Sequence, residues 1–282
     1  MSTPIDEPEA RKRAIAGVFD RGAGTYDQVG VDFFTPAGRD LVARARLRPG
    51  DRILDVGCGR GAVLFAAAEA VGPSGRAVGV DVSSRMAELT AAEARSRGLA
   101  NTTVAQGDAE HLDFPRGAFD AVFGGFVLFF LPDPRAALTH FAALLEPAGR
   151  LAFTTFAAQD PTFDAAMRAV GRFVPGGMPE RGDRQGPFGS AEGITTLLSA
   201  NGFADVTITE ATYESRFADP DHWLAWTWSH GGRATLERVP DGQMEAATEA
   251  AKAELEHART AAGDYLLRTR VRFTIARPAP AS

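Results

Sequence analysis

The sequence predicts an α/β fold, a doubly wound and mostly parallel sheet of seven strands whose last strand runs antiparallel. Three observations predict it. Short apolar runs rich in β-branched and aromatic residues alternate with stretches of helical periodicity through the middle of the chain. A glycine-rich turn follows the first of these runs. The final apolar run alternates with polar residues, as a half-exposed strand does.

The composition excludes several classes of protein. Of the 282 residues, 45% are hydrophobic and 23% are charged, which excludes disorder as the main state. The net charge is −6, so we expect no nucleic-acid partner. A single cysteine, Cys58, excludes a disulfide framework and a multi-cysteine site, and we expect no metal. The N-terminal segment lacks an apolar export signal, and the longest uncharged apolar run, Ala121–Pro132, is too short to cross a bilayer. We therefore expect a cytoplasmic protein with no membrane partner.

Residues 1–48 are expected to form a helical cap, and residues 49–156 the core of the sheet. Helical periodicity in the cap covers Glu9–Phe19 and Asp32–Arg46. Because strands joined by helical crossovers pair in parallel, ligands are expected beyond their carboxyl ends. Strands are predicted at Arg52–Val56, Arg76–Asp81, Thr102–Gly107, Phe119–Gly125 and Gly149–Phe156, and helices at Ala62–Val71, Ser84–Gly98 and Pro134–Leu145.

The chain changes character after this core. Pro175–Pro187 is rich in glycine and proline, which is typical of a connector or a mobile lid. We expect lid or substrate-cap segments at 157–189 and 212–264, and the rest of the core sheet at 190–211 and 265–282. The elements predicted here are a helix at Ser190–Asn201, a strand at Phe203–Thr209, helical segments at Asp221–Ser229 and Glu245–Arg259, and a last strand at Leu266–Ala276 that suits an edge or a hairpin.

Three glycines follow the first predicted strand at alternating positions, Gly57, Gly59 and Gly61. A residue without Cβ lets the backbone turn tightly and approach a ligand closely. The same segment also satisfies the dinucleotide pattern G-x-G-x-x-A, with Ala62 as its last member. The glycines alone therefore leave a nicotinamide ligand and an adenosyl ligand open.

Acidic residues at the strand ends favour the adenosyl ligand. Asp81 ends the second strand, where a carboxylate accepts hydrogen bonds from a ribose of either ligand. Asp55 precedes the glycine turn, where it would repel a pyrophosphate and attract an ammonium group. Asp108, after the third strand, could accept from an adenine amine or could cap a helix. We expect a ligand that joins an adenosine to an amino acid.

These motifs together resemble the class I S-adenosylmethionine-dependent methyltransferases, in particular the small-molecule branch similar to the ubiquinone and menaquinone biosynthesis methyltransferases. The resemblance runs from about Phe19 to Phe203 and implies a Rossmann-like fold. The matching segments are LDVGCGRG (Leu54–Gly61), GVDVSSRM (Gly79–Met86), GDAEHLDFPRGAFD (Gly107–Asp120), LPDPRAAL (Leu131–Leu138) and LLEPAGRLAF (Leu144–Phe153).

The resemblance implies S-adenosyl-L-methionine as the cofactor and assigns residues to it. The segment FDRGAGTYD, from Phe19 to Asp27, is similar to a segment whose tyrosine closes over the cofactor. The implied cofactor residues are Gly57, Cys58 and Gly59 at the methionine portion, Asp55 at its ammonium, Asp81 at the ribose, Val82 and Met86 against adenine, Asp108 and Ala109 at the polar edge of adenine, Gly125 near the sulfonium, and Tyr26 as the closing tyrosine.

The sequence departs from these relatives where many carry a histidine pair in an L-H-H-L-P-D segment. Here the pair is replaced by Phe129 and Phe130, so a base is missing at that place. His230 is the candidate base, because it follows a cluster of all three tryptophans. Two of them, Trp226 and Trp228, would line an apolar pocket together with Phe129 or, alternatively, anchor their segment on the core.

The expected function is methyl transfer to a small apolar or aromatic metabolite, in secondary metabolism or quinone-like biosynthesis. The sequence identifies neither the acceptor atom, which could be carbon, oxygen or nitrogen, nor the oligomeric state. One alternative is a protein that uses the cofactor without transferring its methyl group, as a rearrangement catalyst or a binding module. A further alternative is an NAD-dependent oxidoreductase.

Overall fold

The computed structural model describes residues 7–178 and 186–280, whose strands form one seven-stranded sheet in the order β3-β2-β1-β4-β5-β7-β6. β7 is antiparallel to both of its neighbours, and the pairs among β1 to β5 are parallel. The predicted fold class is therefore confirmed. The strands are β1 (Arg52–Val56), β2 (Arg76–Asp81), β3 (Thr102–Gln106), β4 (Phe119–Gly125), β5 (Leu145–Ala158), β6 (Phe203–Phe217) and β7 (Tyr265–Pro278).

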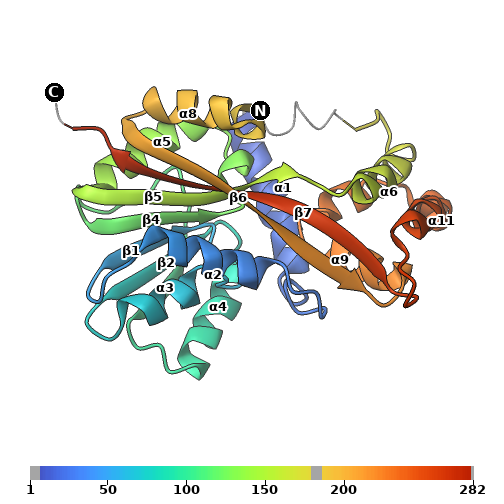
Figure 1. Cartoon of the computed structure of the whole chain (residues 1–282), viewed down its shortest axis with the longest axis horizontal. Coiled ribbons are helices and arrows are strands. Elements are labelled where there is room, and N and C mark those ends of the chain that lie inside the picture. Colours follow the sequence, from blue (N-terminus) through green and yellow to red (C-terminus); the bar gives the residue numbers. More distant parts are fainter. Residues whose placement is uncertain (1–6, 179–185, 281–282) are drawn as a thin grey trace, which may run out of the picture.

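Helices cover both faces of the sheet (Figure 1). β1 shows why, since Ile53 packs in the apolar cluster with α2 and α3, whereas its neighbour Leu54 packs in the cluster with α5 and α8. Alternate side chains of a strand point to opposite faces, so an apolar strand needs cover on both. The helices are α1 (Glu7–Gly22), α2 (Phe34–Ala45), α3 (Leu64–Val71), α4 (Ser84–Ser96), α5 (Pro134–Leu144), α6 (Pro161–Gly171), α8 (Ala191–Ser199), α9 (Pro220–Ser229), α10 (Arg233–Leu236) and α11 (Met244–Leu255), with short 3-10 turns η1 (Leu128–Phe130), η2 (Gly186–Gly189), η3 (Asp241–Gln243) and η4 (Glu256–Ala258). None of these helices is long and apolar enough to cross a membrane.

The last strand, which was expected to be an edge or a hairpin strand, lies inside the sheet and not at its edge. β7 pairs with β5 on one side and with β6 on the other, so β6 is the edge strand. Residues 265–269 of β7 extend past β5 and pair with β6 alone, as the long two-stranded ribbon in Figure 1. The exposed arginines at and next to this part, Arg268 and Arg270, gave the sequence its edge-like alternation. β6 also continues to Phe217, past the expected boundary at residue 212.

The remaining helices gather around the ribbon and the carboxyl ends of the parallel strands. α11 packs on α6 and α9, and α1 packs between α4 and α10. α1 thereby lies across the strand ends, where its side chains line a cavity together with Asp81 and Gly125. Of the loop predicted as a lid, Pro175–Pro187, residues 179–185 lie outside the described residues.

Candidate active site

The turn after β1 has a backbone that only glycine accommodates well. Gly57, Gly59 and Gly61 have φ angles of 61°, 50° and 83°, in the left-handed region that other residues avoid. A Cβ at Gly57 would lie 2.4 Å from the Val127 side chain, and one at Gly61 would lie 2.4 Å from Phe65. The turn is therefore packed from both sides, and its backbone faces the cavity.

Two buried carboxylates flank this turn. Asp55 is 1% exposed, and neither of its side-chain oxygens has a hydrogen-bond partner. Burial raises its pKa well above the usual range, and the nearby Asp81 raises it further. Asp81 accepts hydrogen bonds from the Ser83 N–H at 2.9 Å and the Gly59 N–H at 2.8 Å, yet burial still raises its pKa to about 6. Unpaired buried carboxylates are costly, so the site suits a cationic ligand.

All the residues predicted to bind the cofactor line two adjoining cavities at this turn. The larger has a volume of about 80 Å³, and the smaller, of about 30 Å³, lies beside α2. Tyr26, Gly57, Gly59 and Gly125 line both cavities. The larger, called the cofactor pocket below, adds Asp81, Val82, Met86, Asp108 and Ala109 from the predicted set; the smaller adds Asp55 and Cys58.

Cys58 is buried at this turn with its thiol directed into the sheet. A Cβ on Gly79 of β2 would lie 3.0 Å from the Cys58 sulfur. The Cys58 N–H donates to the Val80 carbonyl at 3.0 Å, and burial raises the pKa of the thiol. The Cys58 side chain therefore serves packing, and its backbone shapes the cavity.

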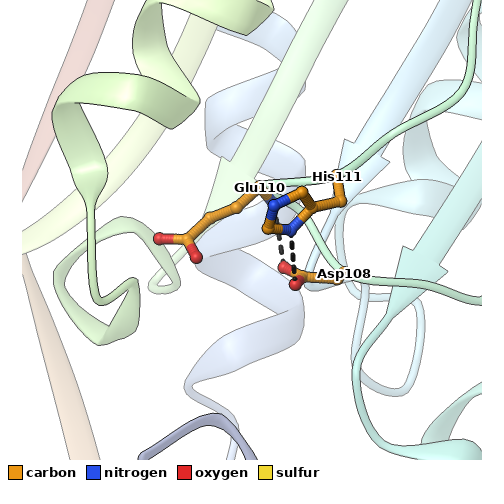
Figure 2. Close-up of side chains that lie close together, drawn as sticks. All are labelled: Asp108, Glu110 and His111. Atoms are coloured by element: carbon orange, nitrogen blue, oxygen red, sulfur yellow. Dashed lines mark hydrogen bonds and ion pairs between the residues drawn. The ribbon is translucent and has the colours of Figure 1, made fainter. Parts of the chain in front are cut away.

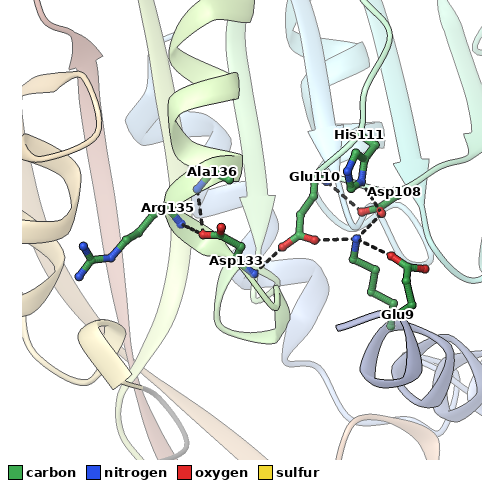
Figure 3. Close-up of polar contacts among 8 residues, drawn as sticks. Glu9, Asp108, Glu110, His111, Asp133, Arg135 and Ala136 are labelled. Carbon is green, nitrogen blue, oxygen red and sulfur yellow. Dashed lines mark hydrogen bonds and ion pairs between the residues drawn. The ribbon is translucent and has the colours of Figure 1, made fainter. Parts of the chain in front are cut away.

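The carboxylate predicted to meet adenine, Asp108, already has protein partners. One oxygen accepts from the Glu110 N–H at 2.9 Å, and the other lies 2.6 Å from the Lys12 ammonium and 3.0 Å from His111 Nδ1 (Figures 2 and 3). Burial raises the pKa of Asp108, but Lys12 and the other hydrogen bonds outweigh it and hold that pKa below its usual value. Sequence reasoning missed Lys12, which itself lines the cofactor pocket.

Asp108, Glu110 and His111 also have the geometry of metal ligands, since one donor atom from each lies within 4.8 Å of the others (Figure 2). The Lys12 ammonium, however, lies 2.6 Å from Asp108 and 2.7 Å from Glu110. These two carboxylates therefore already share a cation from the protein, and we assign the cluster to ion pairing rather than to a metal.

A third cavity, of about 400 Å³, adjoins the cofactor pocket. We call it the acceptor cavity. Phe19, Tyr26, Phe126 and Phe130 line both and so form the boundary between them. The other rings of the acceptor cavity are Phe34, Phe129, which was predicted here, Phe156 and Phe163, and its polar residues include Arg11, Gln159, Asp164, His230 and Thr235.

Two aromatic residues hold this boundary in place. Tyr26 stacks on Phe34, with ring centroids 4.8 Å apart, and burial raises the pKa of its phenol. Phe126, which sequence reasoning missed, follows the end of β4 with a φ of 55°. Its N–H donates to the buried Thr154 hydroxyl at 3.0 Å. A left-handed backbone at a bulky residue is strained, and such strain collects at functional sites.

His230 lines the acceptor cavity as an uncharged ring. Its Nδ1 accepts a hydrogen bond from the Gly232 N–H at 3.1 Å, which places the proton of a neutral ring on Nε2. The Nε2 atom is buried without a partner. The ring packs on Trp226 at 4.3 Å, and burial lowers the pKa of His230 to about 3. At neutral pH the ring has no free lone pair with which to take a proton.

The tryptophan cluster packs outside the acceptor cavity. Trp223 and Trp226 are 1% and 6% exposed and belong to the core, with Trp226 behind His230. Trp228 lies under the Arg233 guanidinium at 5.1 Å. Neither Trp226 nor Trp228 is among the described residues that line the acceptor cavity. This geometry matches the alternative in which the tryptophans anchor α9 on the core.

Comparison with known proteins shows which family the chain belongs to. A family model described as a methyltransferase domain matches residues 47–185. Nocamycin O-methyltransferase of Saccharothrix syringae is 39% identical over 254 residues, 86% of this chain and 91% of that protein. The chain is an S-adenosylmethionine-dependent methyltransferase. Aklanonic acid methyltransferase DauC of Streptomyces sp. strain C5 is 46% identical over 144 residues, which are 51% of the methyltransferase described here and 66% of that relative.

The fold of the methyltransferase is also shared with solved structures. Phosphoethanolamine N-methyltransferase 2 of Haemonchus contortus, solved in complex with S-adenosyl-L-methionine, superimposes with a TM-score of 0.58 at 18% identity. The match covers 92% of this chain and 57% of that one. The predicted resemblance to class I methyltransferases is confirmed, and family membership removes the alternative of an NAD-dependent oxidoreductase.

The residues of the methyltransferase fit S-adenosylmethionine. Asp55 offers an unpartnered buried carboxylate beside a turn whose glycines lack Cβ atoms, which suits a cationic amino-acid group. When bound, the cofactor supplies a methyl group already activated on a sulfonium. The protein therefore has to bind the cofactor, hold an acceptor in line with that methyl group, and exclude water.

Proposed function

We propose that this methyltransferase transfers the methyl group to a carboxylate oxygen of a small aromatic metabolite in secondary metabolism. The observation that carries the proposal is the aromatic acceptor cavity of about 400 Å³ that shares Phe19, Tyr26, Phe126 and Phe130 with the cofactor pocket. Cavities of this size and apolar lining hold small organic ligands. Two relatives support it, since nocamycin O-methyltransferase methylates an oxygen and aklanonic acid methyltransferase acts on an acid.

In this proposal, different residues bind the different parts of the cofactor. The Asp55 carboxylate receives the ammonium group, and the Asp81 carboxylate accepts from the ribose hydroxyls. Val82 and Met86 pack against the adenine. Gly125 and Phe126 lie at the end of β4, next to the acceptor cavity, so the methyl group faces the aromatic boundary.

A carboxylate acceptor suits the chemistry of this cavity. Carboxylic acids are ionised at neutral pH, so methylation of their oxygen requires no base, whereas an alcohol or phenol needs one. Phe129 and Phe130 occupy the place of the histidine pair, and the Nδ1 atom of His230 is already hydrogen bonded. We therefore assign His230 to the cavity wall, with no role in proton transfer.

Arg11 supplies a positive charge for such a substrate. It lines the acceptor cavity and is its only arginine or lysine among the described residues. Its side chain has no hydrogen bond or ion pair within the described ranges and is exposed to solvent. An exposed charge of this kind contributes about 1 kcal/mol or less to the binding of an anion. We expect Arg11 to favour acidic substrates modestly.

The test uses anthraquinone-2-carboxylic acid, its carboxamide and 2-hydroxyanthraquinone as probes. With S-adenosylmethionine present, we expect methyl ester from the acid, with one S-adenosylhomocysteine released per ester, and no product from the amide. Arg11→Gln should raise KM for the acid about fivefold with little change in kcat. Arg13→Gln is the matched control, because Arg13 is exposed on the same helix and lines neither cavity.

Two other outcomes of this test would change the proposed function. Methylation of the hydroxyl but not of the acid would overturn the carboxylate assignment and direct attention to Asp164, the carboxylate that lines the acceptor cavity. Conversion of a bound probe without release of S-adenosylhomocysteine would support the alternative in which the cofactor acts without transferring its methyl group.

A further inference from the structure

Helix α1 is tied to the strand-end loops through one partly buried ammonium. The Lys12 nitrogen lies 2.6 Å from Asp108, 2.7 Å from Glu110 and 3.2 Å from Glu9, and its side chain is only 11% exposed. Asp108 and Glu110 belong to the loop that follows β3. A single side chain thus joins the N-terminal helix to the loop predicted to meet the adenine (Figure 3).

The contact extends to a second wall of the cofactor pocket. The other carboxylate oxygen of Glu110 accepts from the Asp133 N–H at 2.6 Å, and Asp133 caps the start of α5 (Figure 3). The residues just before Asp133, which are Phe130, Leu131 and Pro132, line the cofactor pocket, and Phe130 also lines the acceptor cavity. Lys12 therefore fixes the orientation of Glu110, which in turn supports this second loop.

The side chains of α1 itself close the pocket. Lys12, Ile15 and Phe19 line it together with Asp81 and the neighbouring strand ends. The far end of the helix is held separately, because Asp20 accepts from the Ser83 hydroxyl at 2.6 Å and from the Arg85 N–H at 3.1 Å. Loss of the Lys12 contacts would therefore loosen the first turns of α1 without releasing the whole helix.

We propose that Lys12 is a positioning residue of the cofactor pocket, which orders the loops around the adenine and holds α1 closed over it. Entry and exit of the cofactor then require the Lys12 ion pairs to break. This inference rests on the proposed placement of the adenine at the end of β3. It does not depend on the nature of the methyl acceptor.

Binding of S-adenosylhomocysteine tests the inference without any turnover. Lys12→Met keeps the aliphatic stem but removes the charge, and we expect its Kd, measured by calorimetry, to rise about tenfold, with faster dissociation. Lys12→Arg should recover much of the affinity, because a guanidinium also reaches two carboxylates. Lys252→Met is the control, since Lys252 pairs with Asp221 and Glu249 away from both cavities.

Chemical labelling gives a second readout, because Lys12 and Lys252 are the only lysines of the chain. Saturating S-adenosylhomocysteine should slow acetylation of Lys12 by sulfo-NHS-acetate at least fivefold and leave Lys252 unchanged, as followed by peptide mass spectrometry. Unchanged Lys12 labelling, or wild-type affinity in Lys12→Met, would overturn the inference and leave the proposed function intact. Failure of the wild-type protein to bind S-adenosylhomocysteine would instead overturn the cofactor assignment.

The double variant Lys12→Met with Glu110→Gln separates positioning from simple destabilisation. Lys12→Met alone leaves two partly buried carboxylates without their cation, and this cost would lower stability in general. If Lys12 acts through Glu110, the double variant should bind S-adenosylhomocysteine no more weakly than Lys12→Met. Additive losses from the two substitutions would contradict the proposed coupling.

Discussion

The cofactor pocket and the acceptor cavity share a wall but are built in different ways. The cofactor pocket, about 80 Å³, is formed by the ends of β2 to β4, the glycine turn and side chains of α1, and Asp81 is among its lining residues. The acceptor cavity, about 400 Å³, is formed by rings from α1, α2, η1, β5 and α6, with few charges. The comparison supports the proposal that the cofactor is recognised by backbone geometry and charge, and the acceptor by shape.

The largest effect on ligand binding is expected from removing a charge in the cofactor pocket. Asp81→Asn removes a carboxylate proposed to accept from two ribose hydroxyls. Hydrogen bonds to charged groups contribute about 1.5 kcal/mol each, so Kd for S-adenosylhomocysteine should rise by on the order of 100-fold in calorimetry. Binding of anthraquinone-2-carboxylic acid should be unchanged. An equal loss for both ligands would show that the two cavities do not act separately.

The pH dependence of cofactor binding should follow the ionisation of the Asp81 carboxylate. Burial raises the pKa of Asp81 to about 6, so in the free protein this group is protonated below pH 6. Ribose hydroxyls donate to the ionised form, and affinity should therefore rise as pH increases through 6 and level off above it. At pH 5 we expect Kd roughly tenfold higher than at pH 7.5. Because Asp55 also has a raised pKa, the comparison with Asp81→Asn isolates the contribution of Asp81, and an identical pH profile in that variant would contradict the assignment.

Sequence reasoning reached the cofactor pocket because its features are local. Strands that are followed by a glycine turn or an acidic residue predict both the fold and the residues of the cofactor pocket. The bounds predicted for the first two strands, Arg52–Val56 and Arg76–Asp81, are those observed. Lys12 could not be found this way. It lies in an ordinary charged helix, and its partner Asp108 is 96 positions away. The chain near Lys12 gives no sign of that contact.

The C-terminal strands were harder to predict for a related reason. β6 was expected to end at Thr209, yet it continues to Phe217 through a stretch that contains charged residues. Those charges are paired across the ribbon, since Glu210 contacts Arg270 at 3.1 Å and Glu214 contacts Arg268 at 3.0 Å. Opposite charges facing each other across strands support a sheet. These charged residues suit a strand only because the pairing register of β6 and β7 brings opposite charges together. The sequence by itself does not specify that register.

The smallest effect is expected at His230, and it tests the acceptor side. His230→Gln retains an acceptor near the Gly232 N–H and removes the imidazole. Since the pKa of His230 is lowered to about 3 by burial, the wild-type ring does not titrate between pH 5 and 8. We expect kcat for the acid probe to change less than about fivefold and its pH profile to keep its shape, as measured by S-adenosylhomocysteine release. His257→Gln, at an exposed position, serves as the control.

A general base would instead contribute roughly 10²–10⁴ in rate. A loss of that size in His230→Gln alone would restore the base role that the sequence predicted and would make a phenol or alcohol the preferred acceptor.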